Sequence, residues 1–164
     1  MNAAHFHLIV NHLPIVFPLV GMIVLLVGFY TKSNIVKRTS FLIFFLGAIA
    51  AIVAMLSGEG AEEVVEKING IDERFIEAHE DAAYNLAISS YLLGGLSILA
   101  LWSSWKQKSY ARLLPGIVLT MSMITLLFAA SAGTSGGEIR HTEIRNTSAA
   151  PTPIAPKAGE EDDD

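Results

Sequence analysis

Four long stretches without a charged residue limit what this chain can fold into. They cover residues 13–31, 39–58, 82–105 and 113–137, and Leu, Ile, Val, Phe or Ala fills most of their positions. Each is close to the roughly 20 residues that an α-helix, rising about 1.5 Å per residue, needs to cross about 30 Å of hydrocarbon. None shows the strict apolar–polar alternation that a transmembrane β-strand requires. The sequence therefore predicts an all-α, integral membrane four-helix bundle.

The composition agrees with a membrane protein and excludes several kinds of site. Of the 164 residues, 52% are hydrophobic and the mean hydropathy is +0.48, which exceeds what an ordinary soluble domain carries. Cysteine is absent, which rules out disulfides, iron–sulfur clusters and haem attached through cysteine. The sequence has no phosphate-binding loop, nucleotide fingerprint or nucleophile–base arrangement, so an independent enzyme is the least supported class. No nucleic-acid partner is expected of a chain with a net charge of -5.

The basic residues of the two short connections predict the orientation of the bundle. Three of them follow the first uncharged stretch and three follow the third: Lys32, Lys37, Arg38, Lys106, Lys108 and Arg112. Short loops rich in lysine and arginine stay on the cytoplasmic side of a membrane. We therefore expect a multi-pass protein with both termini on the periplasmic or exterior side. The first stretch is too long for a signal-peptide core and is followed by basic residues, so we expect it to be retained.

Two outer segments carry helical patterns of their own. In residues 59–70 one face is apolar and the other is charged, with Ala61, Val64, Val65 and Ile68 at helical spacing. This pattern predicts a short amphipathic helix that lies on the membrane surface and ends at Asn69-Gly70. Asp72 can cap a second helix that runs directly into the third membrane span. One face of that helix would hold Phe75, Ile76, His79, Ala83 and Leu86.

The chain divides into a transmembrane domain, residues 1–146, and a tail, residues 147–164. The tail combines proline, alanine and small residues with a terminal run of Glu and Asp. Such a composition cannot bury enough apolar surface to fold, so the tail is predicted to be disordered. It contributes much of the acidic charge of the predicted outer side.

All five histidines fall on the predicted outer side of the membrane: His5, His7, His12, His79 and His141. Imidazole is the commonest metal ligand, and a helical bundle can bring ligands from facing helices to one end. The alternative is that an amphipathic ring simply suits the membrane interface, which is our interpretation for His5. His12 lies inside an apolar run beside Pro14, where a polar group is costly, and this favours a ligand role.

A b-type haem is the first interpretation of this cluster. It needs two axial imidazoles on opposing helices, small surfaces that admit the porphyrin, and basic groups near the propionates. Small and basic residues are available at Gly94-Gly95, Gly133, Gly136-Gly137, Arg140 and Arg145, although the glycines also suit close helix packing. We predict His12 and His79 as the axial pair. His7 and His12 are about 140° apart on a straight helix, so His7 and His141 are left as a second pair or as hydrogen-bond partners.

Two other interpretations stay open. A non-haem site for Cu, Fe or Zn would combine histidines with carboxylates such as Glu59, Glu77 or Glu138. Glu138 and His141 even have the Glu-x-x-His spacing of di-iron bundles, but the sequence has no second copy. The third interpretation belongs to a different class, a structural subunit whose outer histidines and carboxylates contact a larger membrane complex.

The stretch from His7 to Pro14 reads His-Leu-Ile-Val-Asn-His-Leu-Pro and resembles a family of small bacterial membrane proteins catalogued as domain of unknown function 2231. Members have two histidines five apart, a histidine before the third of four membrane helices, and Gly-Gly at the end of the fourth. The matching residues, within roughly 5–145, are His7, His12, Pro14, His79 and Gly136-Gly137. Leu8 replaces the usual proline and Leu13 the usual aromatic residue.

This resemblance implies a bacterial cytoplasmic (inner) membrane protein that is at most a haem-binding or redox-associated module. We therefore expect electron transfer rather than substrate turnover. The expected partners are the lipid bilayer and a redox partner or larger membrane complex, and a homo-oligomer is left open.

Overall fold

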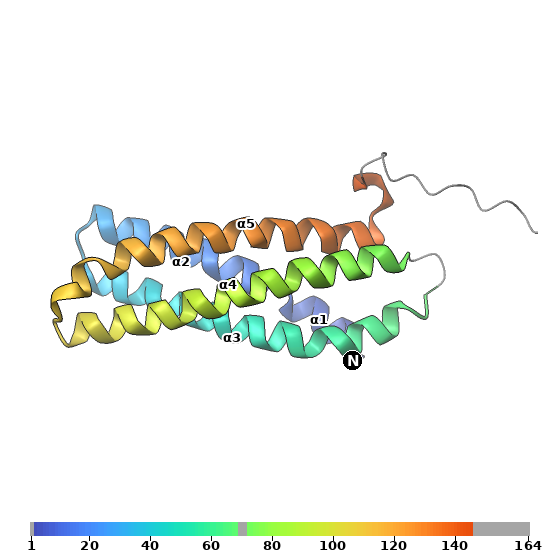
Figure 1. The fold of residues 1–164 in the computed structure, drawn as a ribbon, viewed down its shortest axis with the longest axis horizontal. Helices are drawn as coiled ribbons and strands as arrows, with labels where there is room; N and C mark the ends of the chain where they lie inside the picture. The colour runs from blue at the N-terminus through green and yellow to red at the C-terminus, as the bar shows by residue number, and fades with distance from the viewer. Residues whose placement is uncertain (1, 69–71, 146–164) are drawn as a thin grey trace, which may run out of the picture.

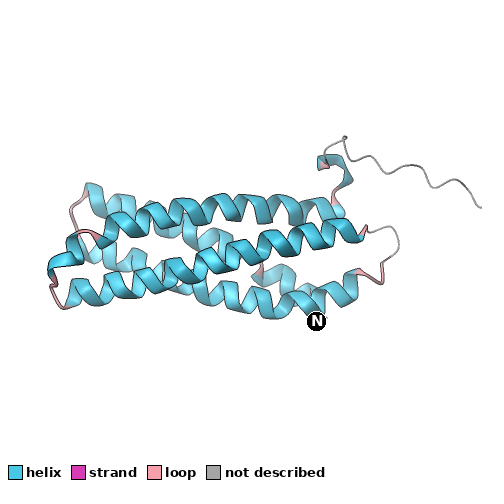
Figure 2. Ribbon diagram, viewed as in Figure 1, coloured by secondary structure: helices cyan, strands magenta, loops and turns pink. Residues whose placement is uncertain are grey.

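The computed structural model describes residues 2–68 and 72–145 (Figure 1). Within these ranges every regular element is a helix, and Figure 2 shows helices joined by loops. Four helical spans are long and apolar enough to cross a membrane, which confirms the predicted all-α, four-helix membrane fold. The predicted disordered tail, 147–164, and the predicted helix end at Asn69-Gly70 lie outside the described residues.

The first span is built from two helices rather than one. The short helix α1 (Ala3–Val10) is followed by α2 (Leu13–Tyr30), and Asn11 and His12 form the turn between them. Pro14 has no backbone N–H, so a continuous helix would leave the carbonyl of Val10 without a partner. The first backbone N–H groups of a helix have no partner within that helix, so Pro14 in the first turn of α2 loses no hydrogen bond.

The remaining helices follow in chain order as α3 (Asn34–Val65), α4 (Glu73–Trp105), the short 3-10 helix η1 (Ser109–Arg112), α5 (Leu114–Arg140) and the 3-10 helix η2 (Thr142–Ile144). Helices α2, α3, α4 and α5 surround one core, and α1 packs chiefly against α3. Figure 1 places the α2–α3 and α4–α5 connections at one end of the bundle. We call this end, residues 31–38 and 105–113, the basic end. We call the other, with α1, the end of α3, the start of α4 and the end of α5, the histidine end.

The predicted separate amphipathic helix over residues 59–70 is wrong, because these residues up to Val65 are the last turns of α3. The segment is helical, and Ala61 is buried as its pattern predicts, but no break separates it from the membrane span. Gly58 and Gly60 do not interrupt the helix. At Gly60 a Cβ atom would be 3.1 Å from the Cβ of Ala3, so the absence of a side chain lets α1 approach α3 closely.

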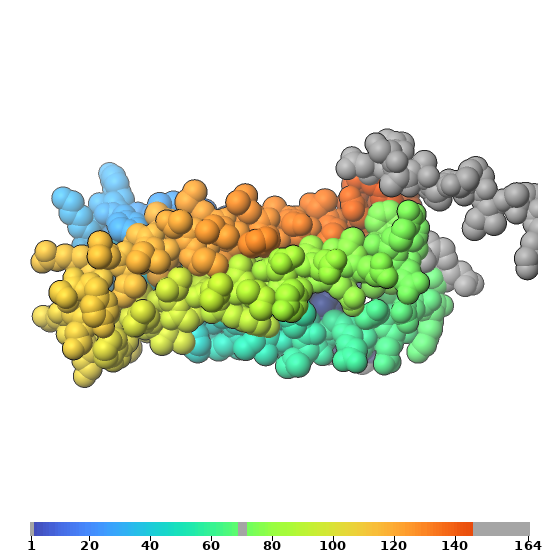
Figure 3. Space-filling view, viewed as in Figure 1, coloured from blue at the N-terminus to red at the C-terminus, as the bar shows by residue number. Residues whose placement is uncertain are grey.

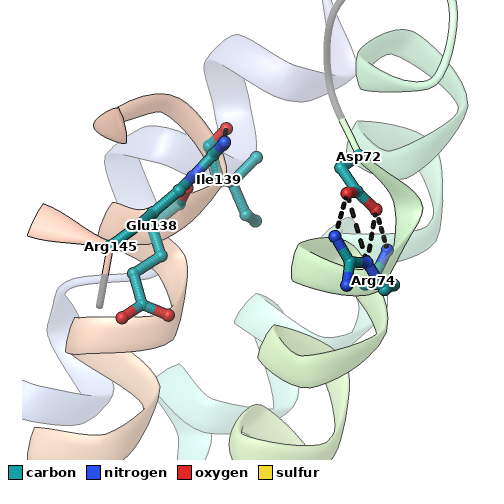
Figure 4. Close-up of polar contacts among 5 residues, drawn as sticks. All are labelled: Asp72, Arg74, Glu138, Ile139 and Arg145. Carbon is teal, nitrogen blue, oxygen red and sulfur yellow. Dashed lines mark hydrogen bonds and ion pairs between the residues drawn. The ribbon is translucent and has the colours of Figure 1, made fainter. Parts of the chain in front are cut away.

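Asp72 caps α4 as predicted. Its side chain accepts a hydrogen bond from the backbone N–H of Arg74 at 3.1 Å and pairs with the Arg74 guanidinium (Figure 4). The hydrogen bonds from the Arg74 side chain and backbone hold the pKa of this carboxyl below its ordinary value. The first turns of α4 turn the predicted face inward, with Ile76 and Leu86 buried and His79 half-buried.

The core of the bundle is apolar and its lipid side is apolar too. The middle of the bundle is filled by Leu25, Phe41, Phe44, Leu93 and Val118. Several buried hydroxyls donate to a carbonyl of the preceding turn, as Ser122 does to Leu119 at 2.7 Å, whereas the hydroxyls of Ser90 and Ser97 have no partner among the described residues. On the outside, large side chains such as Leu56 and Leu127 are exposed. In a membrane protein these side chains contact the lipid bilayer.

Gly94→Ala is expected to lower the free energy of unfolding by about 1–3 kcal/mol, the usual cost of overpacking. A Cβ at Gly94 of α4 would lie 2.5 Å from the Cβ of Ala48 in α3, so the two helices would have to separate. Gly95→Ala is the matched control, because a Cβ there meets nothing within 4 Å. Thermal unfolding in detergent, followed by circular dichroism, compares the variants. Equal midpoints would contradict the close α3–α4 contact.

Candidate functional site

The histidine end brings together one polar side chain from each of four helices. His7 comes from α1, Ser57 from α3, His79 from α4 and Ser135 from α5. Each of the four is partly buried. Two imidazoles and two hydroxyls therefore lie among helices whose other inward side chains are mostly apolar.

His7 is held by a short relay of hydrogen bonds. Its Nδ1 lies 2.9 Å from the Oγ of Ser57, and that hydroxyl donates to the carbonyl of Ala54 at 2.9 Å. A serine hydroxyl has a single proton, so when Ser57 donates to Ala54 its oxygen accepts from the imidazole. In that tautomer His7 carries its proton on Nδ1 and keeps the lone pair of Nε2 free.

His79 is held by a second relay of the same form. Its Nδ1 lies 3.2 Å from the Oγ of Ser135, and that hydroxyl donates to the carbonyl of Ala132 at 3.2 Å. When Ser135 donates to Ala132, His79 likewise carries its proton on Nδ1 and has its free lone pair on Nε2. Gly136 makes room for this ring, since a Cβ there would lie 2.9 Å from the Cε1 of His79.

The two histidines lie at the same end of the bundle, with His7 held by a serine of α3 and His79 by a serine of α5. A histidine that binds a metal normally donates its other ring N–H to a fixed acceptor, which orients the ring and selects the tautomer. His7 and His79 both have this arrangement, with Ser57 and Ser135 as the acceptors.

The sequence favoured His12 as the partner of His79, and the structure directs His7 rather than His12 toward the neighbouring helices. The His12 side chain is exposed, and its Nδ1 lies 3.3 Å from the carbonyl of Leu8. His7 and His12 were expected to face different directions, and they do. The packing of α1 against α3 decides which of them faces inward, and it selects His7. His5 is exposed as well, in keeping with its interfacial interpretation.

The predicted residues at the end of α5 take local roles. His141 follows the last helical residue and is exposed, with its Nδ1 2.9 Å from the Oε1 of Glu143. Since α5 ends at Arg140, Glu138 and His141 do not share the face of a continuous helix. The pKa of Glu143 lies below its ordinary value, because its own backbone N–H and the His141 ring donate to the carboxylate.

Arg145, predicted to lie near haem propionates, closes the end of α5. Its Nε donates to the carbonyl of Glu138 at 2.7 Å, and its terminal nitrogen donates to that of Ile139 at 3.0 Å. The guanidinium also lies 3.9 Å from the ring centre of Phe75. Figure 4 shows the Glu138 carboxylate directed away from this arginine. Arg140 is exposed.

Most glycines that could have formed a porphyrin surface contact other side chains. Gly94 meets Ala48, Gly133 meets Ile15, and Gly137 meets Ile144, while Gly136 meets His79 itself. These contacts support the packing interpretation of the glycines. In the part of the chain that the structure describes, no three His, Asp or Glu side chains are grouped to hold a metal ion. The predicted site of several histidines with Glu59, Glu77 or Glu138 has no counterpart there.

Neither serine was predicted from the sequence, although both stand in similar short motifs. Ser57 is followed by Gly58 and Glu59, and Ser135 is followed by Gly136, Gly137 and Glu138. Each Ser-Gly pair lies at the histidine end, in the second long helix of a helical hairpin. In each hairpin the preceding helical segment carries the histidine that the serine contacts. A search for similarity between the two halves of the chain would have placed Ser57 and Ser135 beside the histidines.

Comparison with known proteins identifies a family. No curated protein and no solved structure matches the chain significantly. A family described as a predicted membrane protein, DUF2231, matches residues 4–144. That range includes α1 through α5 and both histidine–serine relays, so the chain belongs to the DUF2231 family of predicted membrane proteins.

Proposed function

We propose that the histidine end binds a b-type haem, with the Nε2 atoms of His7 and His79 as its two axial ligands. The observation that carries the proposal is the pair of relays, which contact two imidazoles from different helices at Nδ1 and so leave each Nε2 available as a ligand. The revised axial pair keeps His79 and replaces His12 with His7.

The number of donors favours haem over a bare metal ion. Porphyrin fills four positions of a haem iron, so two imidazoles complete its coordination. A structural zinc site uses four protein ligands and a catalytic one uses three. Among the described residues no third His, Asp or Glu joins a group with the pair. The two donors therefore fit haem, and a Cu, Fe or Zn ion would need ligands from beyond the residues that the structure describes.

An apolar cavity lies beside α1, next to the serine that contacts His7, although neither histidine lines it. This cavity of about 370 Å³ between α1 and α3 reaches Ser57, the partner of His7, and is otherwise lined by Ala3, Phe6, Val53, Leu56 and Gly60. In Figure 3 atoms of α1 are visible through an opening between α3 and α4. Since α1 packs chiefly on α3, its other sides are not closed by helix packing. A haem held by both histidines would extend from this side of α1 toward His79 of α4.

The protein groups would then orient the iron ligands and restrict the chemistry. Ser57 and Ser135 fix the direction of each ring through its Nδ1–H, so both lone pairs are presented without reorganisation. When bound, haem supplies reversible one-electron transfer between ferric and ferrous iron. His7 and His79 would both be used to hold the group, which would favour electron transfer to a membrane partner over substrate turnover.

A purified sample tests this function directly. Full-length protein from haem-supplied cells, in mild detergent, is expected to show the Soret and visible bands of a six-coordinate haem, which sharpen on reduction. Elemental analysis is made on the same sample. Colourless protein with near-stoichiometric copper, zinc or iron would replace haem with a metal ion. Colourless and metal-free protein would contradict the cofactor site and favour a structural subunit of a larger complex.

We further infer that the histidine end faces the periplasmic or exterior side, because the opposite end carries the basic connections. A reporter that is active only outside the cytoplasm, fused after Asp164, is expected to be active in a bacterial host. A fusion after Lys32, in the α2–α3 connection, serves as the control and is expected to be inactive. The reverse result would place the histidine pair on the cytoplasmic side.

A further inference from the structure

The basic end of the bundle contains a cavity that the proposed cofactor site does not use. Its volume is about 610 Å³, and it lies between the α2–α3 and α4–α5 connections. Its lining includes Lys37, Ser104, Gln107, Lys108 and Arg112. Three cationic side chains therefore border one cavity, together with polar side chains that can donate hydrogen bonds.

These cations have no carboxylate nearby in the sequence. Residues 1–58 and 82–137 contain no Asp or Glu, so both connections are basic without compensation. The two ion pairs found among the described residues, Asp72 with Arg74 and His141 with Glu143, both lie at the histidine end. The cavity is therefore suited to an anion supplied from outside the chain.

Neighbouring groups hold the wall of the cavity in place. The Nζ of Lys37 lies 5.0 Å from the ring centre of Phe29, and that of Lys108 lies 5.7 Å from the Trp102 ring. Both are cation–π distances. Arg38 donates to the Oγ of Ser104 at 2.9 Å and to its carbonyl at 2.8 Å, which ties α3 to α4 at the cavity.

Aromatic residues set the depth of this end in the bilayer. Tyr30, Trp102, Trp105 and Tyr110 are exposed around the two connections. Tryptophan and tyrosine are enriched where a membrane protein meets the headgroup layer. The cavity thus lies at the level of lipid phosphates. Helices α3 and α5 also begin here, at Asn34 and Leu114, and their N-terminal ends carry partial positive charge.

We propose that this cavity binds the phosphate group of an anionic phospholipid from the adjacent leaflet, with Lys37, Lys108 and Arg112 as the charged contacts. Basic pockets between membrane helices are a recognised form of lipid headgroup site. The same phosphate chemistry could come from a soluble ion. The position at headgroup depth favours the lipid, which is present there at high local concentration.

The test compares two double variants with the same change in charge. Lys108→Gln with Arg112→Gln removes two cations from the cavity wall. Lys32→Gln with Lys106→Gln removes two from the same connections but outside the lining. Full-length protein in detergent is titrated with phosphatidylglycerol or phosphatidylcholine of the same acyl chains, and bound lipid is counted by native mass spectrometry. Circular dichroism verifies that each variant is folded, and the single variant Lys108→Gln replaces the double variant if that one is not.

We expect the unaltered protein to prefer phosphatidylglycerol. Each cation that contacts the phosphate is expected to contribute about fivefold, so the cavity double variant should bind the lipid roughly 10-fold or more weakly. The control should lose less than about twofold, because Lys32 and Lys106 do not line the cavity. Equal losses in both variants would overturn the site in favour of general surface charge. Displacement of the lipid by millimolar inorganic phosphate, or binding of phosphate without lipid preference, would overturn the lipid assignment. The amount of bound lipid is measured without reference to the haem spectrum, so the lipid proposal and the haem proposal can fail separately.

Discussion

Replacing His79 with alanine is expected to abolish the low-spin haem spectrum of the purified protein while leaving the bundle folded and inserted. The substitution removes one of the two iron ligands, so six-coordinate binding is lost. It removes little from the fold, because one half-buried imidazole contributes little beside four apolar spans. His7→Ala is expected to have the same effect. Absorption spectra and haem content per protein measure both variants.

Two other histidines provide matched controls for this experiment. His12 and His141 are on the same side of the molecule but exposed, so His12→Ala and His141→Ala are expected to keep the spectrum unchanged. A spectrum that survives His7→Ala and disappears with His12→Ala would restore the pair first indicated by the sequence. Retention of an unaltered spectrum in both His7→Ala and His79→Ala would show that neither is an axial ligand.

Gly136→Ala is expected to weaken haem binding about 10- to 100-fold without removing any ligand, the range typical of losing an outer hydrogen-bond partner of a metal ligand. The new Cβ would lie 2.9 Å from Cε1 and 3.2 Å from Nδ1 of His79. These distances are shorter than side chains tolerate, so the ring has to move away from Ser135. Haem titration of the apoprotein measures the loss of affinity.

Gly133→Ala is the matched control on the same helix. A Cβ at Gly133 would be 3.6 Å from the Cδ1 of Ile15, which is an ordinary contact. This variant is therefore expected to bind haem normally. Unchanged affinity in Gly136→Ala would mean that the position of the His79 ring against α5 does not matter for binding. Equal weakening in both variants would assign the effect to α5 as a whole.

A glycine in a membrane helix can be explained by two different neighbours. Glycine pairs in a membrane helix indicate close approach, but the sequence does not state whether a cofactor or another helix approaches. At Gly94 the approaching group is Ala48 of α3, and at Gly136 it is the imidazole of His79. Only the position of the neighbouring helix distinguishes these cases. Arg145 is similar, since its role at the end of α5 depends on where the chain turns after Arg140.

The sequence by itself determined the features that depend on local composition. Long uncharged apolar stretches specify membrane helices, because the cost of placing a charge in hydrocarbon applies residue by residue. The cap at Asp72 and the inward face of His79 followed from patterns a few residues long. The family assignment followed from short spaced motifs in the same way.

Only the tertiary structure decided which histidines meet and which atoms they contact. The His7–Ser57 and His79–Ser135 contacts join residues 50 and 56 positions apart, and no local periodicity encodes such distances. The break before Pro14 gives α1 its own direction, and its packing on α3 turns His7 inward and leaves His12 outside. The absence of a break at Gly58 and Gly60 likewise reflects contact with α1 rather than local helix preference. A side chain's neighbours depend on how whole helices pack, and that packing is a property of the complete chain.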